Sequence, residues 1–132
     1  MRGIAHIMLN VSDFLRSEAF YDRLLFPLGF SENYREETDD VALKSYILNE
    51  HNIWIKSDRA SPHLPFVRDS GLDHLAFAAR YKSEVDEMYE VLRDAKVHIT
   101  RPPAAYPEYS ANYYAFYFRD PDGIPLEIAH SM

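Results

Sequence analysis

Residues 113–130 read YYAFYFRDPDGIPLEIAH and predict a β-hairpin. Residues 120–123 (DPDG) favour a tight turn, because proline presets φ, aspartate side chains bond nearby backbone groups, and glycine accepts a positive φ. In the return strand the two isoleucines and Leu126 share one face, and Glu127 lies on the other. An unpaired buried carboxylate is costly, so Glu127 requires a partner.

The chain before this hairpin follows one pattern of strand, helix and strands twice. In the first half the expected elements are a strand at 4–11, a helix capped by Ser12 or Asp13, and strands near 30–38, 41–49 and 53–57. In the second half they are a strand at 72–79, a helix from a Ser83 cap through Ala95, a proline-interrupted edge segment at 99–106, and the hairpin. A shift of 68 residues, from position 6 to position 74, aligns His6 with His74 and Tyr21 with Tyr89.

This repeat predicts an α+β fold of two βαβββ modules. We expect the modules at residues 1–58 and 71–132, with a linker at 59–70, within a single domain that covers residues 1–132. Neither half is long enough to bury a core alone, so the sheets are expected to join.

Composition excludes several classes of protein. The chain has 132 residues, a formal net charge of −7 and no basic run, which argues against nucleic acid as a partner. It has no cysteine, so disulfides and thiolate metal sites are absent. No apolar run approaches the roughly 20 residues that span a bilayer, and no leader is evident, which predicts a cytoplasmic protein without a membrane partner.

Two histidines and one carboxylate occupy equivalent positions in the pattern. His6 and His74 each lie near the start of a lead strand, on the face opposite its apolar side chains, and Glu127 lies on the corresponding face of the last strand. Two histidines and a carboxylate form a facial set that holds a divalent first-row metal and leaves positions open for a substrate. Alternatively, each histidine is structural, and Glu127 pairs with Arg119, Lys56 or Lys44.

The strand before the turn offers two tyrosines to the same face. If Phe116 and Phe118 face the helix, alternation places Tyr113 and Tyr117 at the cavity, where a phenol can donate a hydrogen bond to an oxyanion.

The first module offers further wall residues. Trp54 and Lys56 share one face of a strand, whereas Ile53 and Ile55 suit the side packed on the helix. Met8 lies on the face of His6 and is flexible enough to leave space beside it. We therefore expect Trp54, Lys56, Met8 and Tyr113 to contact the substrate.

Three stretches carry a resemblance to a known family. Residues 5–13 (AHIMLNVSD) with Phe20-Tyr21, residues 72–77 (LDHLAF) and residues 118–127 (FRDPDGIPLE) resemble the two module openings and the closing strand of the vicinal oxygen chelate superfamily. That superfamily contains glyoxalases, bleomycin resistance proteins and extradiol dioxygenases. The resemblance extends over essentially the whole chain, in the same order and spacing.

The resemblance implies a curled mixed sheet around a metal and ligand cavity. It also implies that His6, His74 and Glu127 bind a divalent metal (Mn, Fe, Ni, Zn or Co), and that the metal stabilises an oxyanion on a substrate chelated through two oxygens. Glyoxalase I adds a fourth ligand where this chain has Trp54, Ile55 and Lys56, which argues against standard glyoxalase I activity.

The sequence therefore predicts a small metal-dependent enzyme: a lyase, transferase or dioxygenase. Tyr117 is its candidate catalytic donor, its substrate is a small oxygen-rich molecule, and a homodimer is expected. Two alternatives stay open: a binding protein of the bleomycin-resistance type without catalysis, and an inactive descendant that keeps the fold.

Overall fold

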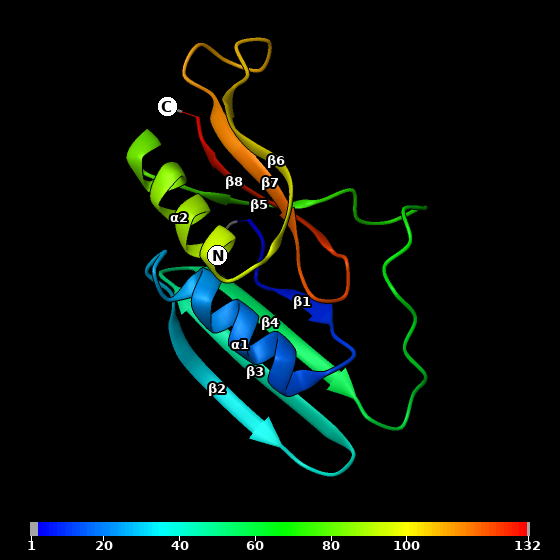
Figure 1. Cartoon of the computed structure of the whole chain (residues 1–132). Coiled ribbons are helices and arrows are strands. Elements are labelled where there is room, and N and C mark those ends of the chain that lie inside the picture. The colour runs from blue at the N-terminus through cyan, green and yellow to red at the C-terminus, as the bar shows by residue number, and fades with distance from the viewer. Residues whose placement is uncertain (1–2, 132) are drawn as a thin grey trace. The chain divides into compact units, whose positions relative to one another are not determined.

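The computed structural model describes residues 3–131 and contains the predicted repeat of two βαβββ modules (Figure 1). The first module consists of β1 (Ile7–Asn10), α1 (Phe14–Leu25), β2 (Ser31–Glu37), β3 (Val41–Leu48) and β4 (His51–Asp58). The second consists of β5 (Leu75–Ala78), α2 (Lys82–Asp94), β6 (His98–Ala105), β7 (Tyr114–Arg119) and β8 (Pro125–His130). The chain divides into two compact units between Leu64 and Pro65. The α+β class and the repeat are thereby confirmed.

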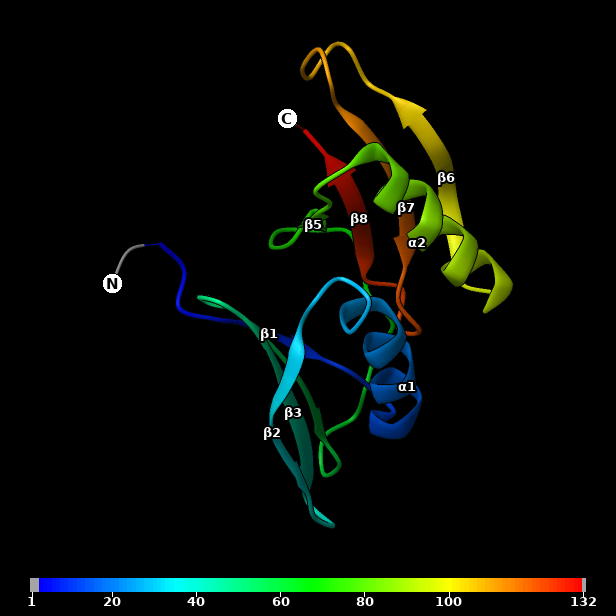
Figure 2. The same cartoon turned by 90° about the vertical axis from the view of Figure 1, so that its left-hand side faces the viewer.

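Each module forms a four-stranded mixed sheet with the same strand order. The orders are β1-β4-β3-β2 and β5-β8-β7-β6 (Figure 1), and Figure 2 shows β8, β7 and β6 side by side in the second sheet. In both sheets the first strand pairs in parallel with the last, and the remaining pairs are antiparallel. A parallel pair needs a long crossover connection, and the helix with its following strands provides it. This topology brings the lead strand of each module beside its closing strand.

Each helix packs on one face of its own sheet. The buried residues of α1 are Phe14, Ser17, Phe20, Tyr21, Leu24 and Leu25, and those of α2 are Val85, Met88 and Leu92. These residues recur at the helical period, which is what an amphipathic helix buries on a sheet. Among residues 3–131, neither helix has the length and apolar character needed to cross a membrane.

The two helix starts differ. Asp13 caps α1 as predicted, because its side chain accepts a hydrogen bond from the Arg16 backbone N–H at 3.1 Å. The prediction of a Ser83 cap for α2 is wrong, since the helix begins at Lys82. The Glu84 carboxylate accepts the Arg80 backbone N–H at 2.7 Å, and this bond satisfies a donor at the helix start in place of the serine.

The closing hairpin has the predicted turn. The Asp120 carboxylate accepts hydrogen bonds from the backbone N–H groups of Asp122 and Ile124, both at 2.8 Å. Gly123 has φ +89°, a left-handed conformation that favours glycine. The turn sets the register of β7 and β8, in which Tyr117 lies opposite Glu127.

Candidate functional site

One row of side chains crosses the sheet of the second module on the face away from α2. The register aligns Ala76 with Glu127, Glu127 with Tyr117, and Tyr117 with Arg101. Phe116 packs edge-on against Tyr89 of α2, with ring centroids 5.6 Å apart, so its neighbour Tyr117 points to the opposite face. The expected alternation of β7 is thereby observed, and Glu127 and Tyr117 share the face without a helix.

His74 and Glu127 contact each other on this face. The Nε2 atom of His74 lies 3.0 Å from Oε2 of Glu127, whose side chain is only 1% exposed. The Tyr113 hydroxyl donates to the other carboxylate oxygen of Glu127 at 2.6 Å. Both oxygens of this buried carboxylate therefore have a polar partner.

The basic residues considered as partners for Glu127 do not pair with it: Arg119 and Lys44 donate to other acceptors, and Lys56 belongs to the first unit. Arg119 donates from a terminal guanidinium nitrogen to the Gly123 carbonyl at 2.9 Å. Lys44 donates to Asp22 of α1 at 2.8 Å, within the first unit. Glu127 is thus satisfied by an imidazole and a phenol.

Asp73 holds the other ring nitrogen of His74. Its Oδ1 atom lies 2.7 Å from His74 Nδ1, and its Oδ2 atom lies 2.9 Å from an Arg68 guanidinium nitrogen. The hydrogen bond from His74 and the charge of Arg68 lower the pKa of the Asp73 carboxyl. A carboxylate acts only as an acceptor and His74 has one beside each ring nitrogen, so a neutral ring can donate to only one of Asp73 and Glu127. The sequence reasoning missed Asp73, although an acidic residue directly before a candidate ligand histidine was a usable signal.

The two tyrosines of the site remain protonated donors. Burial raises the pKa of Tyr113, and its hydrogen bond to Glu127 raises that pKa further. Burial and the negative charge of Glu127 raise the pKa of Tyr117 in the same way. The ring of Tyr117 also meets the His74 ring edge-on, with centroids 6.1 Å apart. A phenol is protonated at neutral pH even at its ordinary pKa near 10, and these shifts move ionisation of both hydroxyls further from neutral pH.

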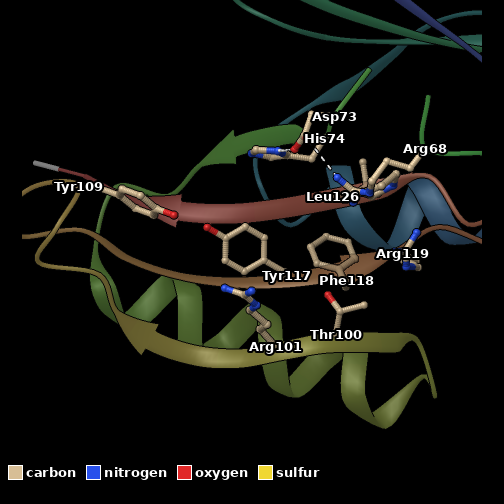
Figure 3. A pocket seen from close by; sticks show the side chains of 11 residues that line it. Arg68, Asp73, His74, Thr100, Arg101, Tyr109, Tyr117, Phe118, Arg119 and Leu126 are labelled. Atoms are coloured by element: carbon tan, nitrogen blue, oxygen red, sulfur yellow. Dashed lines mark hydrogen bonds and ion pairs between the residues drawn. The ribbon is translucent and has the colours of Figure 1, made fainter. Parts of the chain in front are cut away.

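A pocket of about 340 Å³ opens on this face, and all the residues that line it belong to the unit that begins at Pro65 (Figure 3). Its polar and aromatic lining includes Arg68, Arg101, Arg119, His74, Tyr109 and Tyr117. This volume lies at the small end of the range for small-molecule sites. Sequence reasoning identified none of these arginines as pocket residues. Arg101 and Arg119 reach the pocket through strand pairing, and Arg68 lies in the irregular loop before β5.

The candidates of the first module gather on the corresponding face of their own sheet. The register places Met8 beside Trp54 and Asn10 beside Lys56, and His6 directly precedes β1. The Trp54 ring also packs against Tyr34, with centroids 5.9 Å apart.

The three predicted metal ligands are divided between the units: His6 belongs to the first, and His74 and Glu127 belong to the second. Within either unit, residues 3–131 include no group of three His, Asp or Glu side chains that could hold a metal ion.

A family model and a relative of known sequence both match nearly the whole chain. Residues 3–128 match the family model described as the Glyoxalase/Bleomycin resistance protein/Dioxygenase superfamily. The chain is 32% identical over 126 residues to the uncharacterized protein YqjT of Bacillus subtilis, a match that covers 93% of this chain and 94% of the relative.

Solved structures share the fold. A glyoxylase/bleomycin resistance protein/dioxygenase domain from Frankia has a TM-score of 0.83 and 25% identity, over 100% of this chain and 93% of that one. A variant of the fosfomycin resistance protein FosX from Listeria monocytogenes, in complex with Mn(II) and 1S,2S-dihydroxypropylphosphonic acid, has a TM-score of 0.76 and 21% identity, over 100% and 94% of the two chains. From the family match, the repeated βαβββ topology and the relatives together, this chain belongs to the glyoxalase/bleomycin resistance protein/dioxygenase superfamily.

Proposed function

We propose that this protein is a metal-dependent enzyme of its superfamily, in which His6, His74 and Glu127 bind one divalent metal ion. The reaction class is a lyase, transferase or dioxygenase reaction on a small oxygen-rich substrate. The observation that carries this proposal is the contact between His74 Nε2 and Glu127 Oε2, with Asp73 on the opposite ring nitrogen. The metal would be Mn, Fe, Ni, Zn or Co.

The donor atoms of the second module suit a cation. When Nδ1 donates its proton to Asp73, a neutral His74 turns the lone pair of Nε2 toward a carboxylate oxygen 3.0 Å away. Two acceptors at this separation require either a second proton on the ring or a cation between them. His74 and Glu127 would therefore both serve as ligands of a divalent ion. Asp73 would then orient the imidazole, as carboxylates do beside ligating histidines.

The tyrosines of the site would bind and orient the substrate and the ligand side chains. A divalent metal held there would supply a Lewis acid. Tyr117 would donate a hydrogen bond to the substrate oxygen on which negative charge develops, and we assign it as the catalytic donor. Tyr113 fixes the Glu127 carboxylate through its 2.6 Å hydrogen bond and forms part of the substrate wall.

The first module would complete the site. We propose that His6 is the third ligand and that Met8, Trp54 and Lys56 contact the substrate, so that the two modules act as one functional domain. The modules that share an ion belong either to one chain or to two chains of a homodimer. The Mn(II) complex of FosX supports the proposal, because that protein of the same fold holds a divalent metal.

Metal analysis tests the proposal. We expect protein purified without chelator and supplemented with each candidate metal to hold one ion per site. His6→Ala and His74→Ala should both lose it, whereas His63→Ala, a change at an exposed histidine hydrogen-bonded to the Asp58 carbonyl, should keep it. If the wild-type protein takes up no metal after supplementation, the enzyme proposal is wrong and a small-molecule binder of the bleomycin-resistance type is favoured.

A further inference from the structure

The pocket of the second module is positively charged in a chain that is acidic as a whole. The chain has 21 acidic and 14 basic residues, yet three arginines and a single aspartate line the pocket. Like charges repel one another unless opposite charges balance them, so this excess of positive charge in the pocket needs a reason.

The three arginines differ in how far they are engaged. Arg68 forms an ion pair with Asp73 at 2.9 Å. Arg119 donates one hydrogen bond to the Gly123 carbonyl, and Arg101 stacks over the Tyr117 ring at 5.8 Å from its centroid. Within residues 3–131, neither Arg101 nor Arg119 forms an ion pair with a carboxylate. Most of the guanidinium donors of these two residues are therefore free for a ligand.

The sheet register places Arg101 and Arg119 near the candidate catalytic tyrosine. Arg101 of β6 lies opposite Tyr117 of β7, and Arg119 lies two residues along β7 on the same face. In Figure 3, Tyr117 lies between His74 and Arg101. The pocket therefore has a His74 end, beside Glu127, and an arginine end at Arg101, with Tyr117 between them and Arg119 farther along β7.

We propose that the arginine end binds an anionic group of the substrate, namely a phosphonate, phosphate or carboxylate. Arg101 and Arg119 act as binding residues there. The planar guanidinium presents paired donors that match two oxygens of such a group, which a neutral substituent cannot replace. This inference rests on the proposed function for the location of the reacting oxygens, which would lie at the His74 end. The substrate class is then a small organic anion whose other oxygens reach His74 and Glu127.

Titration calorimetry with three probes tests this inference. Phenylphosphonate and benzoate carry the two kinds of head group, and benzamide has the shape of benzoate without its charge. We expect both anions to bind the wild-type protein and benzamide to bind at least about tenfold more weakly, with anion affinity falling as salt is added. The anion that binds with the higher affinity identifies the head group that the site prefers.

Variants locate the binding residue. Arg101→Gln should weaken both anions about tenfold or more, because a charge-assisted bidentate bond is lost, and Arg101→Lys should recover only part of that affinity. Arg93→Gln removes the same charge from an exposed position on α2 and should change nothing. Arg101 makes no hydrogen bond to the rest of residues 3–131, so its loss should leave the fold intact. Three outcomes would overturn the proposal. Benzoate and benzamide could bind the wild-type protein equally well, or neither anion could bind it. Alternatively, Arg101→Gln could bind the anions as tightly as Arg93→Gln does.

The same titrations in chelator-treated His74→Ala separate this inference from the proposed function. Anion binding should survive there and still depend on Arg101, because the arginines need no metal. Metal content should in turn be unchanged in Arg101→Gln. Failure of metal binding with intact anion binding would contradict only the proposed function, and the reverse result would contradict only the anion site.

Discussion

His74 Nε2 lies 3.0 Å from Glu127 Oε2, although 53 positions separate the two residues in the chain. The parallel pairing of β5 with β8 creates this contact, because it aligns Ala76 with Glu127 and brings the residue that precedes β5 to the same face. A buried carboxylate is held there by an imidazole on one oxygen and by the Tyr113 hydroxyl on the other. The following predictions test what this arrangement does.

Replacement of Glu127 by glutamine should abolish tight metal binding. Glu127→Gln keeps the size of the side chain and one carbonyl acceptor for the Tyr113 hydroxyl, but it removes the charge that a divalent ion needs. We expect affinity for Mn(II) or Zn(II) to fall at least about 100-fold, measured by competition with a chelating dye. Glu108→Gln, a change at an exposed loop residue, serves as the control. An affinity equal to that of the control would show that Glu127 is not a ligand.

Asp73 should act as a positioning residue for His74. Asp73→Asn retains a side-chain oxygen but no longer favours a proton on Nδ1, so the imidazole is less strongly oriented. We expect a loss of about 10–100-fold in metal affinity with no change in metal stoichiometry. Asp69→Asn tests for a general effect of removing a negative charge from the same loop, and it should leave the affinity unchanged. A fall of the same size in both variants would contradict the assignment.

Loss of the Tyr113 hydroxyl should destabilise the second module. Tyr113→Phe leaves Oε1 of the buried Glu127 carboxylate without its donor, and we expect a loss of about 1–3 kcal/mol in the free energy of unfolding. Urea denaturation measures this loss. Tyr109→Phe is the matched control, because Tyr109 is 61% exposed and contributes ring contacts to the same cluster. Equal stability of the two variants would mean that the 2.6 Å hydrogen bond contributes nothing.

A buried lysine should make the first module sensitive to acid. Lys44 is 3% exposed and contacts carboxylate oxygens of Glu18, Asp22 and Glu32 at 3.1, 2.8 and 3.1 Å. Burial alone would lower the pKa of Lys44, but its hydrogen bonds to these carboxylates outweigh burial and the net shift is upward. The hydrogen bond from Arg35, with a further contribution from Lys44, lowers the pKa of Glu18 below its ordinary value of 4.5.

The direction of the pH effect follows from the lowered pKa of Glu18. Its stabilising contribution is complete above the ordinary value of 4.5 and is lost as the pH falls through the lower pKa of the folded state. Lys44→Met should therefore cost about 1–3 kcal/mol at neutral pH, because the carboxylates lose their cation, and less near pH 3. Urea unfolding at both pH values, with Lys56→Met as a control on the neighbouring strand, measures the difference. An equal loss at both pH values would contradict this electrostatic account.

Local patterns in the sequence predicted the elements well where neighbouring residues determine the structure. The alternation in β7 and β8 and the turn at residues 120–123 depend on contacts only a few positions apart. The start of α2 was predicted less well, because the Glu84 side chain reaches back to Arg80 and replaces the expected serine cap. A side chain with several rotatable bonds can satisfy a backbone donor from more than one position, so capping is harder to read from residue types than alternation is.

The candidate site could be predicted only in part for the same reason. His6 and His74 stood out because they recur in equivalent places of a repeat, and Glu127 stood out as a single carboxylate in an apolar closing strand. The roles of Asp73 and Arg101 did not stand out, since neither residue has a counterpart in the repeat or a characteristic spacing. Asp73 matters because it lies beside His74 Nδ1, and Arg101 matters because it lies over the Tyr117 ring; both contacts arise only in the folded chain.

The sequence by itself determined the two βαβββ modules, the faces of their strands and the family, because periodicity and turn chemistry act over short distances along the chain. Only the tertiary structure decided that Asp73, His74, Glu127 and Tyr113 form one hydrogen-bonded chain beside an arginine-lined pocket. Strand pairing joins residues that are distant in sequence, and the register of that pairing is fixed by the packing of the whole sheet on its helix rather than by any of the residues it brings together.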